Sequence, residues 1–197
     1  METQSNKAFI DYIRLFLKDN NPSVENQLHE IGECFMPLTL SKNKRLVEEH
    51  HVCSYFCFVE SGILQHAFSV DGEETTTYLA LRNSVTSSLN SFLNGTPSRK
   101  SIKALVESQL WVIDFNSFQE LRTHNATFRE FYHNLIEKQI ILIDEYRIDL
   151  LTLTPEERYQ KMWITEPKLL QEVPLHYLAS FLGISSRHMS RIRKNIK

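Results

Sequence analysis

The chain has 197 residues, of which 42% are hydrophobic and 23% charged, and its formal net charge is −2. This composition is ordinary for a globular protein with one or two cores, and it excludes collagen-like and disordered chains. The sequence shows no apolar stretch long enough to span a membrane and no secretion signal, so we expect a cytoplasmic protein without a membrane partner.

The charge is distributed unevenly. From Glu172 to Lys197, five Lys or Arg residues stand against one acid, which leaves 17 of the 22 basic and 23 of the 24 acidic residues in the rest of the chain. An acidic body with a basic end is typical of a protein with a separate DNA-contacting module, although a solvated basic tail would have the same composition.

The first predicted elements are helices. Apolar side chains at helical spacing predict one helix over residues 7–19, and a second helix follows Pro22 with Val24, Leu28 and Ile31 on one face. After Gly32 the residue pattern changes, so we expect these N-terminal helices to end there.

From Phe35 to about Phe115, short runs rich in Val, Ile, Phe, Tyr and Thr are separated by turn residues. Such spacing predicts an antiparallel β-sandwich, barrel or roll. Asp71-Gly72 predicts a tight hairpin between residues 64–70 and 75–81, because both residue types tolerate positive φ.

Residues 125–152 contain no Gly or Pro and predict one long helix with two apolar rows. One row could pack on the β-domain while the other meets the same helix of a second subunit; both could instead be buried within one subunit. The first row is Phe128, Tyr132, Leu135, Leu142 and Tyr146, and the second is Ile136, Ile140, Ile143 and Leu150.

Thr154-Pro155-Glu156-Glu157 is a capping box with a proline at the first helical position, and it predicts a new helix and a new domain from residue 153. Leu175 to Lys194 then fits two short helices that cross steeply. Ala179 is the small residue at the crossing and Gly183 suits a left-handed turn, while Ser185 can cap the second helix. Residues expected in the shared core are Leu178, Leu182, Ile184, Met189 and Ile192.

The outer face of the second helix is basic and carries short polar side chains. Arg can donate two hydrogen bonds to guanine in the major groove, and Ser suits phosphates, so we expect double-stranded DNA as the partner. A solvated helical hairpin is the simpler alternative. The predicted DNA-binding residues are Ser185, Ser186, Arg187, His188, Ser190, Arg191, Arg193 and Lys194.

The order of elements resembles the Crp/Fnr family of bacterial transcription regulators over nearly the whole chain. Residues 58–64 (FVESGIL), followed by the hairpin at 71–74, are similar to the strand–Gly–strand signature of the cyclic-nucleotide-binding-like domain. Residues 156–159, 173–175, 179–185 and 189–194 are similar to a short branch whose members end just after the recognition helix. A full wing after that helix is then lacking, which predicts modest DNA affinity that depends on dimerisation.

The resemblance implies an α+β fold: N-terminal helices with an antiparallel, jelly-roll-like β-roll over residues 1–124, a long dimerisation helix over 125–152, and a helix-turn-helix domain over 153–197. It implies a homodimer through residues 128–150 whose recognition helices read half-sites about 34 Å apart. Arg191 stands where relatives place a base-contacting arginine. Arg187 replaces a common glutamate, so the family's usual half-site does not carry over.

Cyclic-nucleotide binders of this family neutralise the phosphate with an arginine and contact the ribose with a Gly-Glu pair. Here the matching stretch has no Gly-Glu pair, Ser98 takes the arginine position, and Arg99 comes one residue late. We therefore predict no response to cyclic AMP, although a shift of the loop alignment would bring Arg99 or Lys100 into place. Another unidentified effector could bind, or side chains could fill the pocket; the candidate lining residues are Thr86, Ser87, Ser88, Asn90, Ser98 and Arg99.

Three cysteines, Cys34, Cys53 and Cys57, predict reduced thiols rather than a disulfide framework. If residues 53–59 form a strand, Cys53 and Cys57 lie ~13 Å apart, so we predict no metal site and no cofactor. No catalytic motif is found, and we expect no enzyme activity. The hypothesis is a sequence-specific DNA-binding transcription regulator. The alternatives are a sensor module that acts through a small molecule or protein without DNA, and a nucleotide-binding switch.

Overall fold

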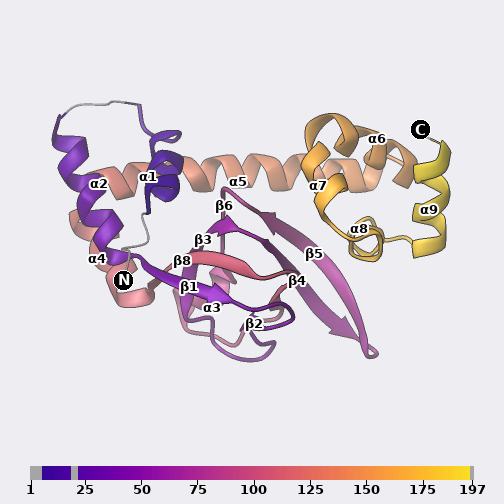
Figure 1. The fold of residues 1–197 in the computed structure, drawn as a ribbon, viewed down its shortest axis with the longest axis horizontal. Helices are drawn as coiled ribbons and strands as arrows, with labels where there is room; N and C mark the ends of the chain where they lie inside the picture. Colours follow the sequence, from indigo (N-terminus) through magenta and orange to yellow (C-terminus); the bar gives the residue numbers. More distant parts are fainter. Residues whose placement is uncertain (1–5, 19–21, 196–197) are drawn as a thin grey trace.

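The computed structural model describes residues 6–18 and 22–195, and within them the chain forms an α+β fold (Figure 1). Helices α1 (Lys7–Arg14) and α2 (Pro22–Cys34) precede the strands. The predicted first helix over residues 7–19 is too long, because α1 ends at Arg14 and residues 15–18 continue as a turn; residue 19 lies outside the described residues. The strands are β1 (Met36–Leu40), β2 (Arg45–Val47), β3 (Tyr55–Ser61), β4 (Ile63–Val70), β5 (Glu73–Leu81), β6 (Ser84–Thr86), β7 (Ser101–Ala104) and β8 (Ser108–Asp114).

The strands form two antiparallel sheets that face each other as a roll. One sheet has the order β1-β8-β3-β6 and the other β2-β7-β4-β5. The predicted hairpin joins β4 and β5, with Val70 opposite Glu73 and with Asp71 and Gly72 at φ 51° and 84°. These positive φ angles explain why Asp-Gly is suited to this turn. The expected antiparallel β-roll is confirmed.

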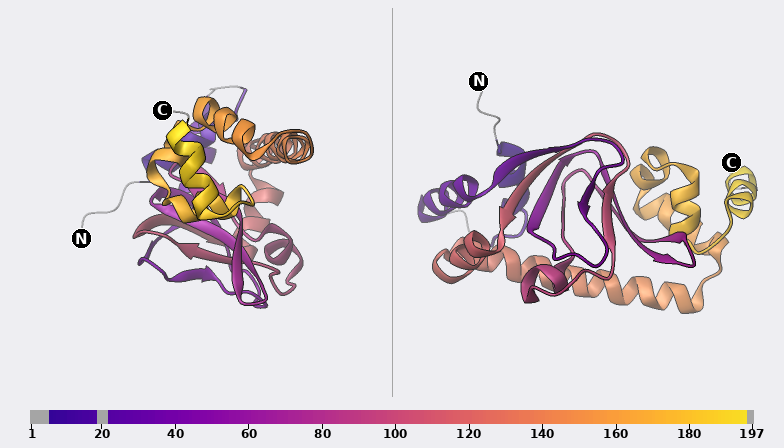
Figure 2. Two further views of the ribbon diagram at one scale, coloured as in Figure 1. Left: turned by 90° about the vertical axis from the view of Figure 1, so that its right-hand side faces the viewer. Right: turned by 90° about the horizontal axis from the view of Figure 1, so that it is seen from below.

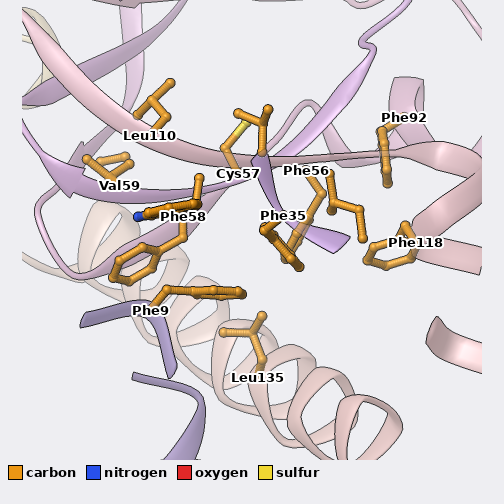
Figure 3. Packing of buried hydrophobic residues seen from close by; sticks show 14 of the residues in the cluster. Phe9, Phe35, Phe56, Cys57, Phe58, Val59, Phe92, Leu110, Phe118 and Leu135 are labelled. Atoms are coloured by element: carbon orange, nitrogen blue, oxygen red, sulfur yellow. The ribbon is translucent and has the colours of Figure 1, made fainter. Parts of the chain in front are cut away.

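An aromatic cluster lies between the sheet that contains β3 and the helices that cover it. Figure 3 shows Phe9 of α1 gathered with Phe35 and Phe58 near Leu135 of the long helix, and all four are buried. The ring centroids of Phe9 and Phe58 are 5.2 Å apart. Since burying one such side chain contributes roughly 1.5–3 kcal/mol, this cluster fixes the helices to the roll.

Helix α3 (Leu89–Asn94) lies between β6 and β7, and α4 (Phe115–His124) leads into the long helix α5 (Ala126–Thr152). The Asn125 side chain caps α5 by accepting from the backbone N–H of Phe128. Phe128, Phe131 and Leu135 are buried against the roll, whereas the apolar residues after position 139 are largely exposed. Leu142 of the first predicted row is 46% exposed, whereas Leu135 of the same row is buried, so that row is not covered along its whole length in one subunit.

Four shorter helices follow within the described residues: α6 (Pro155–Thr165), α7 (Pro167–Glu172), α8 (Leu175–Phe181) and α9 (Ser186–Asn195). The capping box is present, since Thr154 and Glu157 bond to each other's backbone amides. The apolar cluster of these helices also contains Ile63, Leu79 and Leu105 of the roll. Figure 2 shows the C-terminal helices at one end of the roll, with α5 running along both.

Candidate nucleic-acid interface and sensor pocket

Helices α8 and α9 are joined by a tight turn at Gly183, whose φ of 69° is the left-handed geometry expected there. The backbone N–H of Ile184 donates to the Ala179 carbonyl at 3.0 Å, and Ser185 Oγ accepts from the His188 N–H at 3.2 Å, as the capping prediction requires. Four of the five predicted core residues are buried and Ile184 is half-buried, so one face of each helix lies inside. The buried ones are Leu178, Leu182, Met189 and Ile192.

Other elements hold α8 from several directions. Arg158 of α6 donates through Nη2 to the Leu182 carbonyl at 2.9 Å, and the Tyr146 hydroxyl of α5 donates to the Phe181 carbonyl at 3.2 Å. Toward the roll, the Thr76 N–H donates to Ser180 Oγ at 2.9 Å. The sequence pattern did not single out these roles, because each joins residues that are far apart in the chain.

The outer face of α9 is strongly basic. Arg187, Arg191, Arg193 and Lys194 are exposed, and none of these four cations has an ion-pair partner among the described residues. Ser185 and Ser186 are exposed as well, whereas His188 and Ser190 are half-buried. His188 differs from the four cations in having an acidic neighbour, since its Nε2 lies 2.7 Å from Glu156 Oε1. The structure thus brings the eight predicted residues onto one helix and its cap.

The hydroxyl groups of the predicted sensor loop are hydrogen-bonded to one another, to backbone carbonyls and to a histidine of β4. Ser88 Oγ and Ser98 Oγ are 2.7 Å apart, and Ser98 Oγ donates to the Lys100 carbonyl at 2.6 Å. Ser87 Oγ donates to the Tyr55 carbonyl at 3.0 Å, and Thr86 Oγ1 is bonded to His66 Nε2. These groups are therefore already satisfied by protein partners.

Two residues of the predicted pocket lie elsewhere. Asn90 and Arg99 are exposed, and Asn90 accepts from Asn94 Nδ2 on its own helix. Ser98, at the position expected for a phosphate-binding arginine, is buried and faces Ser88. The structure thus groups Thr86, Ser87, Ser88 and Ser98, and it separates Asn90 and Arg99 from them.

Two polar residues inside the roll were not among the predicted lining. His66 of β4 is only 2% exposed, and its Nδ1 has no hydrogen-bond partner. Burial, together with the nearby charge of Lys100, holds the pKa of His66 well below its usual value. Lys100 is half-buried, and burial lowers its pKa. The sequence could have indicated that His66 faces the interior, because it follows Leu64 by two positions on the same strand and so points to the same side.

The cysteines are free thiols in this structure. Strand β3 begins at Tyr55, so Cys53 precedes the strand and the spacing argument from a strand over residues 53–59 is wrong in its premise. Cys57 is fully buried, which raises the pKa of its thiol well above the usual range. Across residues 6–18 and 22–195, no three His, Cys, Asp or Glu side chains are placed to share a metal ion.

The comparisons with known proteins agree with the roll. Residues 37–125 match the cyclic nucleotide-binding domain. No curated protein sequence matches the chain significantly. Within its described part, no helix has the length and apolar composition to cross a membrane.

Solved structures share the architecture at low sequence identity. A protein assigned to the Crp/Fnr family of transcriptional regulators, from Eubacterium rectale, superposes with a TM-score of 0.66 at 15% identity, covering 92% of this chain and 87% of that one. FixK2 from Bradyrhizobium japonicum gives 0.65 at 14% identity, with 82% and 84% covered. A variant of CooA from Carboxydothermus hydrogenoformans gives 0.64 at 13% identity, with 100% and 85% covered. The chain therefore has a cyclic-nucleotide-binding-like roll followed by a long helix and further C-terminal helices, a fold that it shares with solved Crp/Fnr regulators.

Proposed function

We propose that this chain is a cytoplasmic, non-enzymatic transcription regulator of the Crp/Fnr type, in which α8 and α9 form a helix-turn-helix that binds double-stranded DNA in a sequence-specific manner. The observation that carries the proposal is the row of four exposed cations on α9 that have no ion-pair partner among the described residues, opposite a face that is buried in the α6–α9 cluster. Its exposed arginines match the donors that read guanine, and its serines suit phosphates. We assign base readout to Arg191.

The regulator acts as a homodimer through α5. Ile140, Ile141 and Ile143 are 61%, 59% and 65% exposed, so these three side chains are largely uncovered by the described residues of one subunit. A second copy of the same helix would bury these side chains and place two α9 helices on one duplex. The proposed interface covers residues 128–150, and exposed Leu151 lies just beyond it.

The roll is the sensor domain, and we propose that it does not respond to cyclic AMP. A buried phosphate needs a paired cation, and Ser98 occupies the place of the arginine. The hydroxyls that would meet a ligand are bonded instead to protein partners, Ser88 to Ser98 and Ser98 to the Lys100 carbonyl. Any effector is therefore a small molecule of another kind.

The test is retention on random duplex DNA across a salt series, with an Arg191→Ala variant. DNA binding by the wild-type chain should weaken steeply as the salt concentration rises, because phosphate contacts release counterions. A plot of log affinity against log salt concentration should fall with a slope of roughly one per phosphate contact. R191A should lose selectivity for a selected site by more than it loses affinity for random duplex.

Arg82→Ala is the matched control, since Arg82 is an exposed arginine that follows β5 of the roll and is not part of α9. It should bind like the wild type. If R191A lost the same amount of affinity on all DNA sequences, Arg191 would be a phosphate contact and not a base contact. Retention that does not depend on salt would instead favour a sensor module that acts without DNA.

A further inference from the structure

A carboxylate touches the basic face of α9. Glu156, in the first turn of α6, lies with Oε1 2.7 Å from Nε2 of His188 in the first turn of α9. The two residues line one open groove of about 350 Å³, and Arg191 is also part of its lining. A negative charge therefore sits beside cations that the proposed function assigns to DNA.

The folding of α6 does not require Glu156 at this place. Glu157 completes the capping box by accepting from the Thr154 N–H at 2.8 Å, so the helix start already has its acid. The side chains of His188 and Glu156 are 40% and 47% exposed, and contacts between partly exposed charged groups stabilise little. Hydrogen bonds from its own backbone amide and from His188 hold the pKa of the Glu156 carboxyl below its usual range, so it is ionised at neutral pH.

We propose that Glu156 opposes duplex binding and sets the affinity of α9 for DNA, an inference that rests on the proposed function. Its charge lies within the screening length of about 10 Å from phosphates that contact His188 or Arg191, so it repels every duplex that docks there. It also engages the His188 Nε2–H, which is then not available to a phosphate. The basic face is thus partly neutralised from within the chain, at residues 156 and 188.

The experiment compares Glu156→Gln and Glu156→Ala with a matched control, Glu33→Gln. Glu33 forms the same kind of exposed contact with His29, Oε1 to Nδ1 at 3.6 Å, on α2 at the other end of the molecule (Figure 1). Dissociation constants for a fluorescent random-sequence duplex are measured by anisotropy at low and high salt, and thermal unfolding confirms that each variant is folded.

E156Q keeps the side chain's size and an oxygen for His188 while it removes the charge. It should tighten binding roughly 3–10-fold at low salt, with a smaller gain at high salt as screening grows. E156A should tighten binding at least as much, because it also frees His188. E33Q should bind like the wild type.

The failures are distinguishable. If the wild type binds duplex in a salt-dependent manner and E156Q binds no tighter than E33Q, this inference is overturned while the proposed function stands. A gain that is equal at low and high salt would also overturn it, since the effect would not be electrostatic. If the wild type binds no duplex at all, both the proposed function and the inference fall.

Discussion

His66 lies in an environment that disfavours its charged form. Its ring lies inside the apolar roll, where Nε2 is hydrogen-bonded to Thr86 and Nδ1 has no partner. The ring packs edge-on against Tyr78, with 5.2 Å between the two ring centroids. Burial and the Lys100 charge both disfavour the imidazolium, so the folded protein holds this ring neutral. A buried histidine of this kind links folding to pH.

The prediction concerns stability in mild acid. Because the folded pKa of His66 is lowered, the unfolded chain binds a proton below about pH 6.5 that the folded chain does not. The free energy of unfolding should therefore fall as pH drops below that value, by up to about 1.4 kcal/mol per pH unit from this group. Urea unfolding between pH 5 and 7.5 measures it.

His66→Gln keeps a polar atom near Thr86 and removes the titration, so its stability should depend less steeply on pH. His29→Gln, at an exposed histidine, serves as the control and should keep the wild-type slope. Identical slopes for the wild type and H66Q would show that His66 is not the group responsible.

The two halves of helix α5 differ in how far their apolar side chains are buried. Its first half packs on the rest of the protein through the buried residues Phe128, Phe131 and Leu135. Its second half exposes four consecutive apolar side chains at positions 140–143. A helix that is apolar over so much of its surface is stable in water when another surface covers it. The proposed dimer supplies that cover.

Ile143→Asp should therefore shift the protein from dimer to monomer in sedimentation velocity, because it places a charge in the seam of two apolar helices. Leu15→Asp is the matched control, since Leu15 is also highly exposed, at 79%, but lies just after α1. L15D should sediment like the wild type. A wild-type chain that is monomeric at micromolar concentration, or an I143D chain that stays dimeric, would rule out this interface.

At the scale of the whole molecule, the roll and the C-terminal helices share more than the α5 connection. Leu79 and Leu105 of the roll lie in the same apolar cluster as Leu178, and Ser180 of α8 donates to the Glu74 carbonyl of β5 at 3.3 Å. Figure 2 shows these helices against the end of the roll. A displacement of the β4–β5 hairpin would therefore alter the hydrogen bonds and packing that position α8.

Cyclic AMP should leave the whole molecule unaffected. A ligand present at 100 times its dissociation constant stabilises the folded state by about 2.7 kcal/mol, which shifts the unfolding midpoint by several degrees. We expect no shift with about 1 mM cyclic AMP, since the loop hydroxyls are already bonded to protein groups and Ser98 carries no charge. Noncyclic AMP is the control for unspecific effects. A midpoint that rises only with the cyclic nucleotide would show that the loop opens to bind it.

The sequence by itself determined the local features. Asp71-Gly72 fixed a hairpin, Thr154 with Glu157 fixed a helix start, and Gly183 fixed the turn between α8 and α9. Each of these depends on the φ angles or hydrogen bonds of a few consecutive residues, so residue type is sufficient to predict it. The basic face of α9 was predictable for the same reason, because helical spacing alone places its side chains together.

Only the tertiary structure decided which distant residues meet. The Glu156–His188 contact, the Ser180 contact with β5 and the closeness of Lys100 to His66 join separate elements. The difference between exposed Leu142 and buried Leu135, which share one predicted row, likewise depends on what packs against each turn of α5. Residue type and spacing define what each side chain can do, but its partner depends on how whole elements pack, and that packing is a property of the complete core.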